Sequence, residues 1–226
     1  SHSESFQKEV VSARLDAAHE LWGVPCFMGA YNLGHEWFIS GPGGRDPRPA
    51  RLTSTSGEPE SLTINGGYAM RAWHDIRDLT PEGRDDEEGF AEARGRIGQY
   101  LATEVARGIA STRIVLAGFS QGGAVALHVG LRHDAPLAGI LALSCYLPLR
   151  SRLAAELADA NRATPVLMCH GSQDNVVMQH FGEISRDAMR AQGINVEWRS
   201  YPMPHSVCAE EVVDISRWLR ERLEIS

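Results

Sequence analysis

The chain has 226 residues, of which 43% are hydrophobic and 23% charged; this is typical of one globular domain and argues against a disordered or fibrous protein. Its formal net charge is −7 at pH 7. An acidic chain is repelled by phosphate backbones and anionic lipids, so we expect no nucleic-acid partner and no stable membrane insertion. The four cysteines form no C-x-x-C pair and no zinc spacing, and no leader sequence is visible, which together predict reduced thiols in a cytoplasmic protein.

The first part of the chain, residues 1–61, has weak secondary-structure signals. Residues 5–22 have apolar positions at helical spacing and are followed by Gly-Val-Pro at 23–25, which predicts an amphipathic helix that ends there. Beyond Ile39, a polar stretch rich in glycine and proline runs to about Ser61 and contains no convincing strand. Two interpretations stay open for this stretch: long irregular structure, or strands with poor patterning.

From about Glu82 onward, helix and strand signals alternate. The expected helices are 85–108, 122–132, 151–160, 178–191 and 206–223, and the expected strands are 114–117, 137–144, 165–169 and 196–198. The first helix begins at an acidic cluster, as the helix dipole favours, and has apolar residues at helical spacing, namely Phe90, Ile97, Leu101 and Val105. This alternation predicts a single α/β domain over residues 1–226, with a mostly parallel sheet and helices on both faces. Ligands of such sheets bind beyond the carboxyl ends of the strands.

A candidate nucleophile lies between the first strand of this series and the helix after it. Residues 118–122 read Gly-Phe-Ser-Gln-Gly and fit G-x-S-x-G. A strand before and a helix after are the context of a nucleophile elbow, a sharp turn that presents the hydroxyl of Ser120. The backbone N–H of Gln121 would then stabilise the oxyanion of an acyl-transfer intermediate. The alternative is a glycine-rich turn in which Ser120 is a bystander.

A serine hydroxyl needs a base and an orienting acid, which in this architecture follow in the order Ser, acid, His. His205 lies in a proline-stiffened loop between the last strand and the last helix, and is the best base. Asp174 follows the strand at 165–169, at the carboxyl edge of the sheet, and is the best acid. His170 leaves little room for a preceding acid. The alternatives are a loop histidine without a role and an aspartate that forms an Asx turn.

Four segments, at residues 63–76, 116–123, 170–174 and 201–205, resemble the small carboxylesterase and acyl-protein thioesterase family of α/β-hydrolases. The resemblance runs from Leu62 to Leu223. It implies an α/β-hydrolase fold, hydrolysis of carboxylic esters, and in some members cleavage of lysophospholipids or thioesters. The family's Ser-Asp-His triad falls on the same three residues chosen above from position. The resemblance also sets Trp73 near the substrate pocket, with ordinary core packing as the alternative, and leaves a homodimer open.

The N-terminal part departs from the family pattern. The family has an apolar strand ending in His-Gly-Leu-Gly, and its nearest match here is Phe-Met-Gly-Ala at 27–30. The resemblance makes the backbone N–H of Ala30 the second oxyanion donor, beside that of Gln121. The stretch 51–61 also lacks the apolar strand that the family has there. Either a divergent region or a disruption such as a frameshift would produce this pattern.

The sequence therefore predicts a serine esterase that needs no metal or cofactor and works through an acyl-enzyme. The chain is too short for a large cap domain, so we expect an open site and a small-molecule ester substrate with a short to medium acyl chain. Acyl-protein thioesterase or lysophospholipase activity is the first alternative. A catalytically impaired relative that acts as a binding protein is the second, because the N-terminal segment is atypical.

Overall fold

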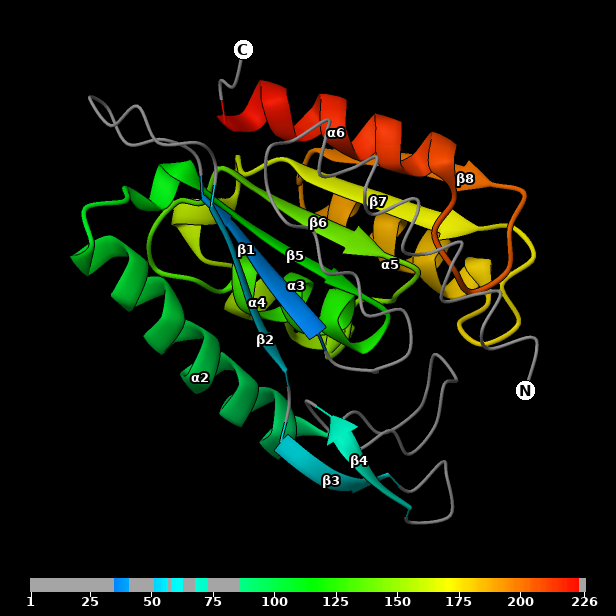
Figure 1. Ribbon diagram of the computed structural model, residues 1–226, viewed down its shortest axis with the longest axis horizontal. Helices are drawn as coiled ribbons and strands as arrows, with labels where there is room; N and C mark the ends of the chain where they lie inside the picture. Colours follow the sequence, from blue (N-terminus) through cyan, green and yellow to red (C-terminus); the bar gives the residue numbers. More distant parts are fainter. Residues whose placement is uncertain (1–34, 41–50, 57, 63–67, 73–85, 224–226) are drawn as a thin grey trace.

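The computed structural model describes residues 35–40, 51–56, 58–62, 68–72 and 86–223, the last range including side chains (Figure 1). Six strands form the main sheet in the order β2-β1-β5-β6-β7-β8. They are β1 (His35–Ser40), β2 (Arg51–Ser56), β5 (Ile114–Phe119), β6 (Gly139–Leu143), β7 (Val166–Gly171) and β8 (Val196–Tyr201). Strands β5 to β8 are parallel, whereas β1 is antiparallel to both of its neighbours. The mostly parallel sheet expected from the sequence is confirmed.

A second, smaller antiparallel pair and a set of helices complete the described part. The pair consists of β3 (Glu58–Leu62) and β4 (Tyr68–Ala72). The helices are α2 (Glu87–Ala106), α3 (Gln121–Leu131), α4 (Leu153–Glu156), α5 (Gln179–Ala191) and α6 (Ala209–Leu223), with short 3₁₀ turns η2 (Ser111–Arg113), η3 (Arg150–Arg152) and η4 (Asp159–Asn161). Four of the five expected helices lie where the sequence predicts them.

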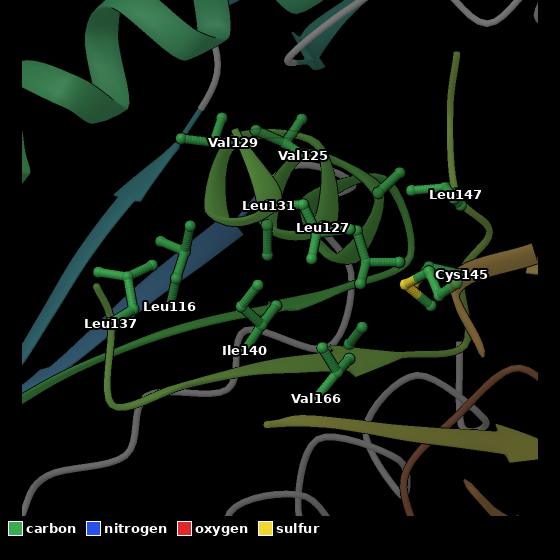
Figure 2. Packing of buried hydrophobic residues seen from close by; sticks show 14 of the residues in the cluster. Leu116, Val125, Leu127, Val129, Leu131, Leu137, Ile140, Cys145, Leu147 and Val166 are labelled. Carbon is green, nitrogen blue, oxygen red and sulfur yellow. The ribbon is translucent and has the colours of Figure 1, made fainter. Parts of the chain in front are cut away.

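The parallel strands are buried on both faces, because successive side chains of a strand point to opposite sides of the sheet. In β5, Ile114 and Leu116 belong to one core, whereas Val115 and Ala117 belong to the other. The first core packs the sheet against α2, α3 and part of α5, and Figure 2 shows its centre around Ile140. The second core packs the opposite face against α6, which lies across the sheet from α2 in Figure 1. The expectation of helices on both faces is therefore confirmed.

Helix α2 meets the core through one stripe, as the helical spacing predicts, but the stripe differs at one position. Phe90, Ile97 and Leu101 are buried together with Ala93. Val105, which the sequence analysis also assigned to this face, is 48% exposed, whereas Glu104 beside it is buried. The apolar face ends one turn earlier than the sequence pattern predicts.

The structure decides between the two interpretations left open for the polar stretch beyond Ile39. Up to Ser61 this stretch contains β2 and most of β3, so the interpretation as strands with poor patterning is confirmed. Strand β2 pairs only with β1 in the described sheet, and a strand at a sheet edge does not need the continuous apolar run that identifies a central parallel strand. The family strand thought to be missing from 51–61 therefore has a counterpart in position, although its sequence is polar.

The helix expected over 151–160 is shorter in the structure than the sequence predicts. Helix α4 covers only Leu153–Glu156, and 3₁₀ turns flank it. Its last residue is followed by Leu157 in an extended conformation (ψ 115°). The backbone N–H of Ala158 then donates to the carbonyl of Leu131 at 3.0 Å, so that it is no longer available to continue the helix.

Some of the sequence-based expectations fall partly or wholly on residues that the structure does not describe. The amphipathic helix expected over 5–22 lies outside the described residues. Cys145, Cys169 and Cys208 are free thiols, as expected, and Cys26 lies outside the described residues. Among the helices described, none is long and apolar enough to span a membrane.

Candidate active site

Ser120 lies at the sharp turn between β5 and α3, as the elbow interpretation predicts. Its backbone has φ 55° and ψ −120°, a conformation that residues with a side chain rarely adopt. The turn is held from both sides, since the N–H of Ser120 donates to Leu143 O at 2.8 Å and its carbonyl accepts from the N–H of Ala124 at 3.1 Å. A Cβ at Gly118 would lie 2.2 Å from the carbonyl carbon of Gly122. The first glycine of the motif is therefore required for the strand and helix to approach so closely.

His205 lies in the loop between β8 and α6, and this loop is tied to the loop that follows β7. The N–H of Ser172 donates to Tyr201 O at 2.8 Å, and that of Gln173 donates to Met203 O at 3.1 Å. A Cβ at Gly171 would lie 2.3 Å from Met203 O, so the absence of a side chain lets the two loops touch. These contacts bring the segment that carries His205 against the segment that carries Asp174.

The structure brings the three residues selected from the sequence into one hydrogen-bonded chain. His205 Nε2 is 3.0 Å from Ser120 Oγ, and His205 Nδ1 is 2.6 Å from Asp174 Oδ2. The Asp174 side chain is fully buried, and that of His205 is 12% exposed. Serine, imidazole and carboxylate are thus arranged in the order and at the distances of a nucleophile, its base and an orienting acid.

The surroundings of Asp174 keep it ionised. Burial alone would raise the pKa of Asp174, but the hydrogen bond and charge of His205, together with the amides of Val176 and Val177, hold it below its ordinary value. Both amides donate to Oδ1 at 2.9 Å. One carboxylate oxygen is therefore fixed by the backbone, and the other is left to accept from the imidazole. The Asx turn considered as the alternative for Asp174 is present as well, and it supports the orientation of the carboxylate.

Two features of the site were missed by the sequence analysis. The ring of Phe119, the second residue of the G-x-S-x-G motif, lies 4.8 Å from the imidazole of His205 at an angle of 50°. Its signal was its place at the end of β5, directly before Ser120. The exposed apolar side chains of Val176 and Met178, 47% and 48% accessible, follow Asp174 in its loop. They lend an apolar character to the surface next to the acid.

The remaining predicted site residues are only partly described. Gln121 is the first residue of α3, directly after Ser120, and is buried. Ala30 and Trp73 lie outside the described residues. Among residues 86–223, no group of three or more histidine, cysteine, aspartate or glutamate side chains is arranged to hold a metal ion.

The sheet order, the elbow and the placement of the three polar side chains are those of an α/β-hydrolase. Comparison with known proteins agrees with this class and narrows it: residues 34–223 match the phospholipase/carboxylesterase family, and the chain belongs to that family. The match begins upstream of Leu62, where the resemblance read from the sequence started, and it includes β1 and β2. Ala30 lies upstream of the matched residues.

The chain is similar to several characterised or solved members. It is 34% identical over 169 residues to acyl-protein thioesterase 1 of Yarrowia lipolytica, covering 73% of this chain and 74% of that protein. It is 39% identical over 171 residues to acyl-protein thioesterase 1 of Neurospora crassa, covering 72% and 69%. Among crystal structures, Arabidopsis thaliana SOBER1 has a TM-score of 0.71 and 28% identity, covering 74% of this chain and 81% of that one. Zea mays acyl-protein thioesterase 2 has a TM-score of 0.68 and 27% identity, covering 78% and 84%.

Proposed function

We propose that this protein is a serine hydrolase that cleaves carboxylic esters of short to medium acyl chains through an acyl-enzyme intermediate. The observation that carries the proposal is the hydrogen-bonded chain from Ser120 through His205 to Asp174, with distances of 3.0 and 2.6 Å. Membership of a hydrolase family supports the reaction class. No metal or cofactor takes part in the proposed reaction.

The proton positions follow from the chemistry of the three groups. An ionised Asp174 only accepts hydrogen bonds, so Nδ1 of His205 carries the proton and Nε2 presents a lone pair to the hydroxyl of Ser120. As Oγ attacks the ester carbonyl, Nε2 takes the hydroxyl proton, and Asp174 stabilises the imidazolium that forms. The imidazolium then protonates the departing alcohol. In the second half-reaction, His205 takes a proton from water, whose oxygen attacks the acyl-enzyme. The bond between the acyl group and Ser120 Oγ then breaks, the imidazolium returns the proton to Oγ, and the acid is released.

The oxyanion of each tetrahedral intermediate is proposed to accept hydrogen bonds from the backbone N–H groups of Gln121 and Ala30. The position of Gln121 at the start of α3 supports the first assignment, whereas the second rests on the sequence pattern. Loss of one such donor typically costs about 10²- to 10³-fold in kcat. Trp73 is proposed to contact the acyl chain, in which case Trp73→Ala raises KM; a core-packing role would instead lower the unfolding temperature.

The test is covalent labelling of the intact protein with a fluorophosphonate, followed by mass spectrometry, beside turnover of p-nitrophenyl acetate. We expect one probe mass on the wild type and none on Ser120→Ala, because the probe reacts only with an activated serine. Turnover should fall to background in the same variant. If the wild type gains no probe mass, or if Ser120→Ala hydrolyses the ester at the wild-type rate, the proposal is wrong. Substantial turnover that depends on Ser120 would also refute a role in binding alone.

Thioesterase activity is the second candidate, because the similar proteins of Yarrowia lipolytica and Neurospora crassa carry that name. The same three side chains can attack an ester or a thioester carbonyl, so the triad geometry does not separate the two. Matched octanoyl esters and octanoyl thioesters, compared by kcat/KM, decide between them. A thioester preference of about 100-fold or more would replace the ester assignment. Including an octanoyl lysophospholipid in the same series tests the lysophospholipase alternative.

A further inference from the structure

A second histidine, His170, lies beside Asp174. His170 belongs to β7, and its side chain is fully buried. Its Nε2 is 2.7 Å from the carbonyl oxygen of Val177 and 3.7 Å from Asp174 Oδ2. The sequence analysis set this histidine aside as a base, and the proposed reaction does not use it.

The contact with Val177 determines which nitrogen of His170 carries the proton. A carbonyl oxygen can only accept, so Nε2 is the donor and the neutral ring has its lone pair on Nδ1. Within residues 86–223, Nδ1 has no hydrogen-bond partner. A proton there would be buried without an acceptor, and burial accordingly lowers the pKa of His170. The ring is held as a neutral Nε2–H imidazole.

The hydrogen bond of His170 closes a small ring of contacts around the acid. The N–H of Val177 donates a hydrogen bond to Asp174 Oδ1, and the carbonyl oxygen of Val177 accepts one from the Nε2–H of His170. Val177, which orients the carboxylate of Asp174, is therefore itself held by a residue of strand β7, His170. With Oδ1 occupied by the amides of Val176 and Val177, Oδ2 is directed at His205 Nδ1.

The position of the imidazole is fixed by packing as well as by this bond. The ring is stacked on Trp198 of β8, with centroids 5.9 Å apart and an interplanar angle of 27°. On the α5 side, a Cβ at Gly182 would lie 2.7 Å from Nδ1, so the ring has no room to move towards the helix. The charged or titratable groups that act on it are Asp174, His205 and Glu183.

We propose that His170 is a positioning residue for the acid of the triad: as a neutral Nε2–H imidazole it holds the Asp174–Val177 turn so that Oδ2 of Asp174 faces Nδ1 of His205. His170 does not touch the substrate, and this role rests on the function proposed above for Ser120. The alternative is a core histidine that contributes only to stability. The positioning role predicts that the hydrogen bond between His205 and Asp174 depends on the donor at position 170, whereas a purely structural role predicts that it does not.

The test compares two substitutions of His170 that differ in the donor they retain. His170→Gln keeps an N–H donor at about the reach of Nε2, whereas His170→Phe keeps the ring and its stacking on Trp198 but has no donor. We expect His170→Phe to lower kcat by about 10²-fold, the effect of misplacing a catalytic group by about 1 Å, with KM unchanged. His170→Gln should retain kcat within a few-fold. The control is His180→Phe, at an exposed histidine at the start of α5, which should behave as the wild type.

A second measurement separates this proposal from the proposed function. The proton in the 2.6 Å hydrogen bond between His205 Nδ1 and Asp174 gives a strongly downfield NMR resonance that does not depend on turnover. We expect the resonance in the wild type and in His170→Gln, and its loss or upfield shift in His170→Phe. This result would support positioning by His170 even if the protein hydrolysed no ester, and an absence of Ser120-dependent labelling would then count against the hydrolase function alone.

Two results would overturn the positioning role. The first is a wild-type kcat and resonance in His170→Phe. The second is an equal loss of kcat in the Phe and Gln variants with an unchanged downfield resonance, which is the signature of a purely structural histidine. If His170→Phe does not fold, Gly182→Ala decides the matter, because its added methyl group presses on Nδ1 without removing a donor. An unchanged kcat and resonance in folded Gly182→Ala would then refute the proposal.

Discussion

Replacing Asp174 by asparagine tests the triad with almost no change in shape. The amide can be placed in two ways, and the backbone chooses between them. Oδ1 accepts the N–H groups of Val176 and Val177, both at 2.9 Å, so the amide oxygen must take that place. The flipped amide would point its NH₂ group at two N–H donors and lose both hydrogen bonds, at a cost of about 2 kcal/mol or more.

The amide NH₂ therefore replaces Oδ2, 2.6 Å from His205 Nδ1. Because NH₂ only donates, Nδ1 must become an acceptor and the imidazole proton moves to Nε2. Nε2 then donates to Ser120 Oγ and no longer accepts the hydroxyl proton. We expect kcat to fall by about 10⁴-fold, the cost of the wrong imidazole tautomer in a Ser-His-Asp triad, with KM changed by little.

The assay is steady-state turnover of p-nitrophenyl acetate together with the rate of fluorophosphonate labelling, and both should fall in parallel. The control is Asp187→Asn, which makes the same exchange on the exposed side of α5, where Asp187 pairs with Arg186 at 2.7 Å. The control should keep wild-type kcat. A loss of less than tenfold in folded Asp174→Asn, or an effect on KM alone, would refute the assignment of Asp174 as the orienting acid.

Three further substitutions test the supports of the fold and the site. Gly118→Ala sets a Cβ 2.2 Å from the backbone of Gly122, so we expect loss of fluorophosphonate labelling, and wild-type labelling would contradict the close approach at the elbow. Asn161→Ala removes a fully buried amide with four hydrogen bonds to its surroundings; the free energy of unfolding in urea should fall by about 3 kcal/mol or more, and a loss below 1 kcal/mol would refute this. Burial raises the pKa of Glu211 from 4.5 to about 8, with the Cys208 amide opposing the rise. A raised carboxyl pKa stabilises the fold at low pH, and this contribution is lost as pH rises from about 4.5 through about 8. Glu211→Gln should therefore unfold at a less pH-dependent temperature across that window, and parallel curves for variant and wild type would contradict the assignment.

The central half of the fold could be predicted because its signals are local. The apolar runs that became β5, β6 and β7 are short and continuous, which indicates strands buried on both faces, and helical spacing separates them. Once the sheet is parallel, polar residues after the strands must gather at one edge. That rule selected Asp174 and His205 from position alone, and the structure brings both to Ser120.

The features that the sequence left open or predicted wrongly depend on contacts between distant parts of the chain. Strand β2 is polar in sequence and acquires its conformation by pairing with β1. Helix α4 is short because the N–H of Ala158 donates to the carbonyl oxygen of Leu131. No pattern in the sequence around residue 158 predicts that hydrogen bond. The support that Val177 gives to Asp174 and receives from His170 likewise requires a turn whose geometry no local pattern specifies. Ala30 and Trp73 stay predictions, since they lie outside the described residues.

Ser120 and Asp174 are held by different parts of the fold, so substitutions near one should affect the site differently from substitutions near the other. Ser120 is fixed by β6 through Leu143 and by the start of α3, neither of which includes the loop of Asp174. His205 is the link between them, since its own loop is tied to the acid loop by backbone hydrogen bonds near Gly171. Changes around Asp174 should therefore lower the reactivity of Ser120 while leaving its backbone in place, whereas a change at Gly118 removes the presentation of the hydroxyl itself. Backbone amide shifts at the elbow, unchanged in the first kind of variant and displaced in the second, would distinguish the two.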